Sequence, residues 1–344
     1  MIQRIENSLS LKFPKKDKKF LVLGIECTAH TFGVGVVNHG KILANVRDMY
    51  KPVKGGIIPM ESAEHHRDVA EIVYREAFEK AGVSKNEIKA IAVSNAPGLA
   101  PCLIAGLEFA KKKALELNVP LVPVNHCIAH LEIGQSVGAR DSVLLYASGA
   151  NTQIIAFAAG KYRVFGETLD SGIGNFIDTF ARHVGIAFPG GPEIEKKAKN
   201  AKTFIELPYS IKGMDVSFSG MLTKLKKLYD DGYKLEDLSY SLQETAFAML
   251  VEAAERALAH TEKNELVLGG GVACNKRLQE MCKIMCEERG AQFYTLPNDL
   301  LVDNAAMIAY TGEIMFNAGI MEKNIEKVDI KPRERTDDVV VEWR

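Results

Sequence analysis

The sequence predicts an α/β protein made of two similar lobes, and three observations lead to this prediction. The chain has 344 residues, which is more than a single hydrophobic core usually organises. Patterns typical of strands and helices alternate along it, as they do in layered α/β folds. A group of three strands followed by helices occurs twice, which indicates a duplicated unit.

The first unit opens with predicted strands at residues 21–27, 33–38 and 42–48, and a polar turn at 38–41 joins the last two. The patterns that follow predict a helix at 62–81, a strand at 90–94, a helix after Pro101 and a strand at 121–124. This alternation predicts a sheet with helices packed on it.

The second unit repeats the opening with predicted strands at 144–148, 153–158 and 162–167. Gly160-Lys161 follows Gly40-Lys41 by 120 residues, so the two turns stand at equivalent places. Chance similarity between two β-meanders is the alternative explanation. The remaining predicted elements are helices at 173–183, 239–260, 275–289 and 304–317, and a buried strand at 265–268.

Two lobes that each begin with a polar turn between strands are typical of actin, the Hsp70 chaperones and the sugar kinases. We therefore expect an actin-like ATPase (ASKHA) fold with a cleft for nucleotide phosphates between the lobes, although a likeness in fold does not establish a function. The expected division is an extension at 1–19, a first lobe at 20–140 plus 304–325, a second lobe at 141–303 and a tail at 326–344.

Composition argues against a strongly basic nucleic-acid-binding chain, a membrane-spanning protein and a disulfide-rich protein. The net charge is −1, so any attraction to nucleic acid must come from local patches or partner subunits. No apolar run approaches the length of a membrane span, so we expect no membrane association. The six cysteines form no CxxC pair or dense framework, which favours free thiols in a reducing cytoplasm.

A pair of histidines is the first candidate site. His126 and His130 are four residues apart, and on a helix this spacing puts both rings on one face, suitable for one metal ion. Two unrelated histidines near a helix start would give the same pattern. Cys127 stands where zinc peptidases have their catalytic glutamate, so a peptidase is disfavoured.

An aspartate far along the chain completes the candidate metal site. Asp303 is expected at the N-cap of an apolar helix, a position where capping alone would explain a carboxylate. It becomes a ligand candidate only together with the two histidines.

Glycine-rich turns are candidates for binding a nucleotide. The turn at 148–151 follows a predicted strand, and its backbone N–H groups could hold a phosphate. The 268–275 segment lets backbone approach a ligand closely, and neither turn has P-loop spacing. Asp178 and Glu195 each follow a Gly-containing turn and could accept hydrogen bonds from ribose hydroxyls.

Taken together, these motifs resemble one family, the universal tRNA threonylcarbamoyladenosine synthases, called TsaD in bacteria. The similarity extends from about residue 20 to residue 310, and the Ala-His-Thr-Phe-Gly form at 29–33 is similar to the archaeal and eukaryotic branch, the catalytic subunit of the KEOPS complex. The segments that carry the resemblance are 24–33, 125–130, 146–151, 166–178, 189–192, 213–220, 269–275 and 303–310.

The resemblance implies a specific activity and site. Family members transfer the threonylcarbamoyl group from threonylcarbamoyl-adenylate to N6 of the adenosine next to the anticodon in tRNAs that read ANN codons. It implies one divalent metal, iron or zinc, on His126, His130, Tyr146 and Asp303, with catalytic roles for the two histidines and the aspartate. The implied contacts for ATP or the adenylate are Tyr146, Ala147, Ser148, Gly149, Ala150, Asp178, Gly191, Glu195 and Asn275.

The resemblance also implies partners, and it leaves rivals to be weighed. The implied partners are tRNA and the KEOPS subunits: a Bud-family atypical kinase/ATPase, a small dimerising subunit and a further small subunit. A sugar or acid kinase on the same fold is the strongest rival, but Mg²⁺ prefers oxygen ligands and would leave the paired histidines unexplained. A chaperone-like ATPase would bind ATP without needing His126.

Overall fold

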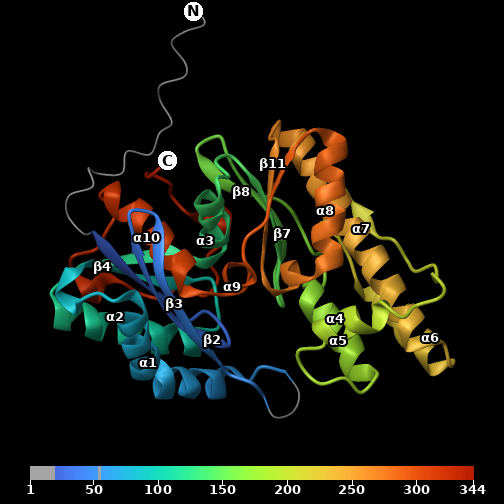
Figure 1. Ribbon diagram of the computed structural model, residues 1–344, viewed down its shortest axis with the longest axis horizontal. Helices are drawn as coiled ribbons and strands as arrows, with labels where there is room; N and C mark the ends of the chain where they lie inside the picture. The colour runs from blue at the N-terminus through green and yellow to red at the C-terminus, as the bar shows by residue number, and fades with distance from the viewer. Residues whose placement is uncertain (1–19, 53–55) are drawn as a thin grey trace, which may run out of the picture.

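The computed structural model describes residues 20–52 and 56–344, so the expected extension at 1–19 lies outside the described residues. Two five-stranded sheets form its framework, one in each half of the molecule (Figure 1). Their strand orders are β3-β2-β1-β4-β5 and β8-β7-β6-β11-β12, so the same topology occurs twice. This correspondence confirms the predicted two-lobed, actin-like α/β architecture.

The first sheet combines an antiparallel meander with two parallel strands. Pairing is antiparallel between β1 and β2 and between β2 and β3, and it is parallel from β1 through β4 to β5. The strands are β1 (Leu21–Glu26), β2 (Thr31–Asn38), β3 (Lys41–Met49), β4 (Ile88–Ala96) and β5 (Leu121–Asn125).

Alternation along β1 explains how the first sheet is covered. Leu21, Leu23 and Ile25 belong to the core beneath α1 (Pro59–Ala81) and α2 (Ala100–Leu117). Val22 and Gly24 face the opposite side, where α10 (Ala305–Asn317) packs. Because successive side chains of a strand point to opposite faces, Glu26 projects to the same side as Gly24.

The second sheet repeats this plan. Pairing is antiparallel from β6 through β7 to β8, and parallel from β6 through β11 to β12. The strands are β6 (Val143–Ala147), β7 (Thr152–Ala158), β8 (Lys161–Glu167), β11 (Glu265–Gly269) and β12 (Gln292–Tyr294). The β2–β3 and β7–β8 turns both pair a non-glycine residue at positive φ with glycine, at His39-Gly40 and Ala159-Gly160.

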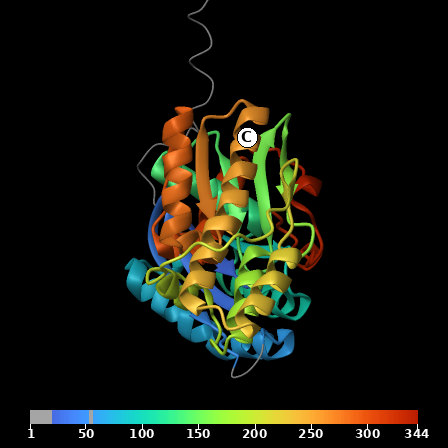
Figure 2. The same ribbon diagram turned by 90° about the vertical axis from the view of Figure 1, so that its right-hand side faces the viewer.

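Helices cover the second half, and a short helix lies between the two sheets (Figures 1 and 2). The long helix α7 packs against β6 and β7, while α8 packs beside β12. The helices are α4 (Ile173–His183), α5 (Gly191–Ala198), α6 (Ser219–Asp230), α7 (Leu235–Thr261), α8 (Lys276–Arg289) and α9 (Asn298–Leu301), with α3 (His126–Glu132) in the central position.

Smaller elements complete the chain. They are the ladder of β9 (Ile211–Lys212) with β10 (Asp215–Val216), and the 3₁₀ turns η1 (Lys85–Glu87), η2 (Ile133–Val137), η3 (Gly271–Cys274), η4 (Ile325–Lys327) and η5 (Thr336–Asp338). Within the described ranges, no helix is both long and apolar enough to cross a bilayer. The domain boundaries expected from the sequence stay a prediction.

Candidate metal centre

The two histidines are presented by α3, which starts where β5 ends. The Asn125 side chain caps this helix, and its Oδ1 accepts hydrogen bonds from the backbone N–H groups of Cys127 at 3.1 Å and Ile128 at 3.3 Å. His126 and His130 are therefore one turn apart on the same face, with ring centroids separated by 4.8 Å. Both side chains are buried.

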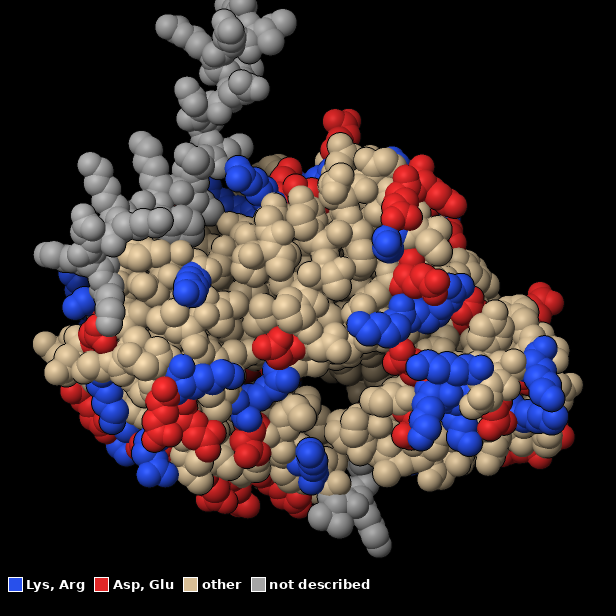
Figure 3. Space-filling view, viewed as in Figure 1, with Lys and Arg blue, Asp and Glu red and all other residues tan. Residues whose placement is uncertain are grey.

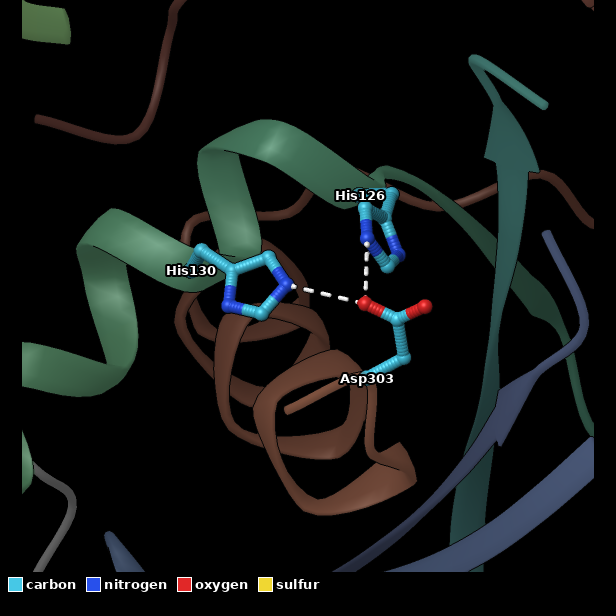
Figure 4. A group of neighbouring side chains, drawn as sticks. All are labelled: His126, His130 and Asp303. Carbon is cyan, nitrogen blue, oxygen red and sulfur yellow. Dashed lines mark hydrogen bonds and ion pairs between the residues drawn. The ribbon is translucent and has the colours of Figure 1, made fainter. Parts of the chain in front are cut away.

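The aspartate reaches the histidines from the other end of the sequence. Asp303 lies in the short link between α9 and α10, and its carboxylate points toward both imidazole rings (Figure 4). The expectation that Asp303 is the helix N-cap is wrong. Asn304 takes that role and accepts a hydrogen bond from Met307 N at 2.9 Å, which leaves the Asp303 carboxylate free to face α3.

The distances in this cluster suit a divalent metal. Asp303 Oδ1 lies 3.3 Å from His126 Nε2 and 3.4 Å from His130 Nε2. Zinc bonds of about 2.0–2.2 Å in a tetrahedral arrangement place neighbouring ligand atoms roughly 3.3–3.6 Å apart. Among the described residues, this is the group of histidine, cysteine and acidic side chains that could hold a metal ion, with ligand atoms within 4.8 Å of one another.

Tyr146 borders the cluster from β6 in the second sheet. Its hydroxyl lies 3.1 Å from His126 Nε2, and its ring centroid lies 4.8 Å from that of His130. Burial, with the Asp303 charge nearby, raises the pKa of the Tyr146 hydroxyl above its usual value. The structure thus brings together His126, His130, Tyr146 and Asp303, the four residues expected to surround the metal.

The buried ionisable groups of the cluster shift one another's pKa values. Burial disfavours the charged imidazole, but the charges of Glu26, Tyr146 and Asp303 outweigh it and raise the pKa of His126 well above its ordinary value. Burial opposes ionisation of Asp303 too, yet His126 and His130 hold the pKa of Asp303 well below its usual range. Burial lowers the pKa of His130. A buried anionic oxygen between two imidazoles is an environment that favours a cation.

Glu26 contacts Nδ1 of His126, the ring nitrogen on the opposite side from Tyr146 and Asp303. Sequence analysis missed this role. Its carboxylate lies 2.9 Å from His126 Nδ1 and also accepts hydrogen bonds from the Thr28 backbone N–H at 2.8 Å and hydroxyl at 2.6 Å. The side chain is fully buried. A glutamate ending the apolar strand LVLGIE was the available signal, because a buried carboxylate needs a partner.

The β6–β7 turn, expected to contact phosphate, is packed tightly from two sides. Ser148 N–H donates to Asn151 O at 2.9 Å, and Asn151 N–H donates to Ser148 Oγ at 3.1 Å. A Cβ atom added to Gly172 would lie 2.4 Å from the Gly149 carbonyl oxygen, so this close approach requires glycine. Ala147 and Ala150 lie at the two ends of the same segment.

The other residues expected to contact nucleotide form two local pairs. Asp178 on α4 accepts a hydrogen bond from Gly190 N–H at 2.7 Å, next to Gly191 at the start of α5. Glu195 accepts one from Lys276 N–H at 3.0 Å, next to Asn275, which caps α8. Burial raises the pKa of Asp178. His30 and Phe188, from the two halves of the chain, have ring centroids 6.4 Å apart.

The surface between the two halves is hollowed on the face shown in Figure 3, and Lys and Arg side chains lie on both sides of the hollow. Asp and Glu side chains lie among these cations in the same view, and the chain as a whole is nearly neutral. Any attraction to a polyanion would therefore depend on how the individual cations are arranged and not on net charge.

Comparisons with known proteins agree on one group of relatives. The sequence model of the family TsaD, described as tRNA N6-adenosine threonylcarbamoyltransferase, matches residues 41–310. A protein of that name from Thermococcus kodakarensis is 55% identical over 94% of this chain and 99% of its own length. One from Archaeoglobus fulgidus is 50% identical over 94% of this chain and 99% of its own length.

Longer relatives and solved structures also match. A Methanosarcina acetivorans protein named as a probable bifunctional tRNA threonylcarbamoyladenosine biosynthesis protein is 51% identical over 95% of this chain, which spans 60% of its length. The structure of Thermococcus kodakarensis HypF superposes with a TM-score of 0.62 at 15% identity, over 91% of this chain and 49% of HypF. Component A of (R)-2-hydroxyglutaryl-CoA dehydratase from Acidaminococcus fermentans superposes with a TM-score of 0.52 at 14% identity. The superposition covers 85% of this chain and 98% of component A. At these identities the two structures show the fold alone.

Proposed function

The chain belongs to the TsaD family of tRNA N6-adenosine threonylcarbamoyltransferases, and from this premise we propose the chemistry that its central cluster performs. We propose that the enzyme transfers the threonylcarbamoyl group from threonylcarbamoyl-adenylate to N6 of the adenosine next to the anticodon in tRNAs that read ANN codons. The His126, His130 and Asp303 cluster is the observation that carries this proposal.

His126, His130, Tyr146 and Asp303 would hold one divalent metal, iron or zinc. When bound there, the metal supplies Lewis acidity toward carbonyl, carboxylate or phosphate oxygens. Two nitrogens and a carboxylate are a donor set that both metals accept, and metal availability decides between them. Glu26 fixes His126 by hydrogen bonding its Nδ1, so that Nε2 faces the cluster.

The nucleotide part of the donor would lie along the two glycine-rich segments. Gly149 and Ala150 would contact phosphate through backbone N–H groups, since those of Ser148 and Asn151 are already used within the turn. Asp178, Gly191, Glu195 and Asn275 would contact the ribose and base side of the adenylate. Tyr146 and Ala147 complete this segment on β6.

These residues act mainly by positioning the substrates. The acyl carbon is attached to an AMP leaving group, so attack by the adenosine amine needs no strong base on the protein. Holding both substrates in a reactive arrangement can lower the barrier by about 7–11 kcal/mol at best. Cations beside the hollow between the two halves would hold the phosphates of the tRNA.

We extend the proposal to the partners and the setting of the enzyme. The chain would act in the cytoplasm as the catalytic subunit of a KEOPS complex. Its partners there would be a Bud-family kinase/ATPase, a small dimerising subunit and a further small subunit. Residues 20–140 with 304–325 and residues 141–303 would be its two lobes.

Replacement of one ligand tests the proposal. The purified chain with its partners, threonylcarbamoyl-adenylate and unmodified tRNA should form threonylcarbamoyladenosine, detected by nucleoside mass spectrometry. His126→Ala should lose the bound metal and the product together. The surface variant His260→Ala should retain both, since His260 is exposed on α7. Undiminished product from His126→Ala would overturn the assignment, and phosphorylation of a sugar or metal-free ATP turnover would support the rival activities.

A further inference from the structure

The segment after η4 crosses from the first sheet to the second and contacts both ends of α3. It is fixed to the first sheet by Lys331 N–H, which donates to Asn95 O at 2.8 Å, and by Gly98 N–H, which donates to Pro332 O at 3.2 Å. At the second sheet, Arg335 pairs with Glu167 of β8 at 3.2 Å. We call residues 331–344 the tail segment.

One contact of the tail segment is with the N-terminal end of α3. The Oδ1 of Asn125 caps the helix, and the Nδ2 of the same side chain donates to Glu334 Oε2 at 3.3 Å. The Glu334 carboxylate therefore stabilises the orientation of the Asn125 amide in which Oδ1 faces the helix. If the amide reversed, the cap that starts α3 would lose its acceptor.

The other contact is with the C-terminal end of α3. Glu132 is fully buried, and Arg344 reaches its Oε1 with Nε at 3.0 Å and Nη2 at 2.8 Å. Tyr162 donates to the same oxygen. The Arg344 guanidinium also lies over the rings of Phe157 and Tyr162, with its central carbon 4.9 and 5.5 Å from the ring centroids.

Helix α3 depends on such external support. It has seven residues, and isolated helices of that length do not form stably in water. It also carries both histidines of the cluster, and Glu132 is two residues beyond His130. A buried carboxylate deprived of its cation is strongly unfavourable, so loss of Arg344 would move the C-terminal end of α3.

We propose that Glu334 and Arg344 are positioning residues that hold α3 at its two ends and so aim His126 and His130 at Asp303. The inference rests on the proposed metal site and assigns to the tail segment a role in building it. Its contribution lies in the orientation of the two ligands, because neither side chain contacts the cluster itself.

Metal affinity and helix protection test this role in the full chain. Arg344→Met and Glu334→Ala should each weaken Zn²⁺ binding by about 10–100-fold in competition with a chromophoric chelator. Both should alter the visible absorption of the Co²⁺ form. Hydrogen exchange of the peptide 126–132 should become faster, while the α8 peptide stays unchanged. The matched control is Arg335→Ala, which removes a tail ion pair that does not contact α3 and should leave Zn²⁺ affinity within twofold.

The outcomes separate this inference from the proposed function. If the unaltered chain fails to bind Zn²⁺, the proposed metal site is wrong. Hydrogen exchange of the peptide 126–132 in the two variants then still decides whether the tail segment holds α3. If Zn²⁺ affinity and α3 exchange stay within twofold of the unaltered chain in both variants, the positioning role is overturned. Partial recovery in Arg344→Lys would support the role of the charge, and if Arg344→Met does not fold, Glu334→Ala alone decides the question.

Discussion

His126 is contacted on both ring nitrogens, which makes it the most constrained residue of the cluster. Glu26 faces Nδ1 at 2.9 Å, while Tyr146 and Asp303 face Nε2 at 3.1 and 3.3 Å. A carboxylate on one nitrogen fixes the tautomer and increases the basicity of the other, a common device behind metal-bound histidines. His130 differs, since its Nδ1 is buried without a partner among the described residues.

We predict that Glu26→Gln weakens metal binding without unfolding the chain. The amide keeps the size of the side chain and one acceptor oxygen, but it loses the charge that supports the Nδ1–H of His126. Zn²⁺ affinity should fall about 10–100-fold, measured by chelator competition. Glu64 is exposed on α1, so Glu64→Gln should bind Zn²⁺ with the same affinity as the unaltered chain. Equal affinities for both variants would show that Glu26 does not act through His126.

A third buried histidine should make stability depend on pH. Burial, with His65 nearby, lowers the pKa of His66 to about 4. In the unfolded chain the pKa is about 6.5, so the unfolded state binds the proton first. The free energy of unfolding should therefore fall as pH drops from about 6.5 toward 4, and it should fall less in His66→Leu. Urea unfolding at several pH values measures the free energy of unfolding of the unaltered chain and of His66→Leu. The same dependence on pH in both proteins would contradict the prediction.

Sequence patterns could predict part of this site and not the rest. The spacing of His126 and His130 indicates a shared helical face without knowledge of the fold. The partnership of His130 with Asp303 spans 173 residues, and no local pattern encodes it. Sequence analysis could name Asp303 only as a candidate, and the family resemblance then implied that it is a ligand. Glu26 was missed because its role depends on which face of β1 meets α3, and this is a property of the assembled sheet.

At the scale of elements, the close packing of α10 on the first sheet sets the place of Asp303. A Cβ atom added to Gly24 would lie 2.4 Å from Ala305 O, and one added to Gly35 would lie 2.6 Å from Ala305 C. Both contacts are with backbone, which cannot rotate away. The glycines thus let α10 lie directly on β1 and β2, with Asp303 just before its N-terminus.

We predict that Gly35→Ala destabilises the chain and also weakens metal binding. Overpacking against backbone costs about 1–3 kcal/mol, and the required shift of α10 would carry Asp303 with it. Gly220→Ala on α6 is the matched control, because a Cβ there meets nothing within 4 Å. The Gly220→Ala chain should unfold at the same denaturant concentration as the unaltered chain or at a slightly higher one. A Gly35→Ala chain with unaltered stability and Zn²⁺ affinity would show that α10 does not depend on this close contact.

Regular elements were predicted better than irregular ones. The predicted helix at 173–183 matches α4, and both meanders were found because alternation and Gly turns are local signals. Helix α1 starts at Pro59 and α7 at Leu235, several residues before their predicted starts. Helices α5 and α6 and strand β12 were not predicted. The strand β12 has three residues, too few for a pattern, and it exists because β11 offers an edge to pair with.

At the scale of the whole molecule, the cluster connects segments that belong to different layers. Helix α3 lies between the sheets, Tyr146 belongs to β6 of the second sheet, and Asp303 precedes the helix that covers the first. A metal held by all four residues would therefore tie the two halves together. The repeated strand order explains the symmetry of the framework, while the cluster itself has no repeated counterpart in the described residues.

Metal removal should consequently lower the stability of the entire chain. At a free Zn²⁺ concentration 100 times the Kd, binding to the folded state alone adds about 2.7 kcal/mol. The thermal midpoint should fall by several degrees when a chelator removes the metal, and it should recover when Zn²⁺ is added back. His126→Ala should be insensitive to both treatments in the same thermal scans. An unaltered chain whose midpoint ignores chelator and Zn²⁺ would count against a metal that links the halves.

The distance between His130 and Asp303 along the chain has a consequence for biosynthesis. The ribosome adds about 5–20 residues per second, so the 173 residues that separate them take roughly 9–35 s to make. Until then a nascent polypeptide carries the imidazoles without their carboxylate, and it lacks the link between α9 and α10 that brings them together. Acquisition of the proposed ion would accordingly have to wait until residue 303 has been made.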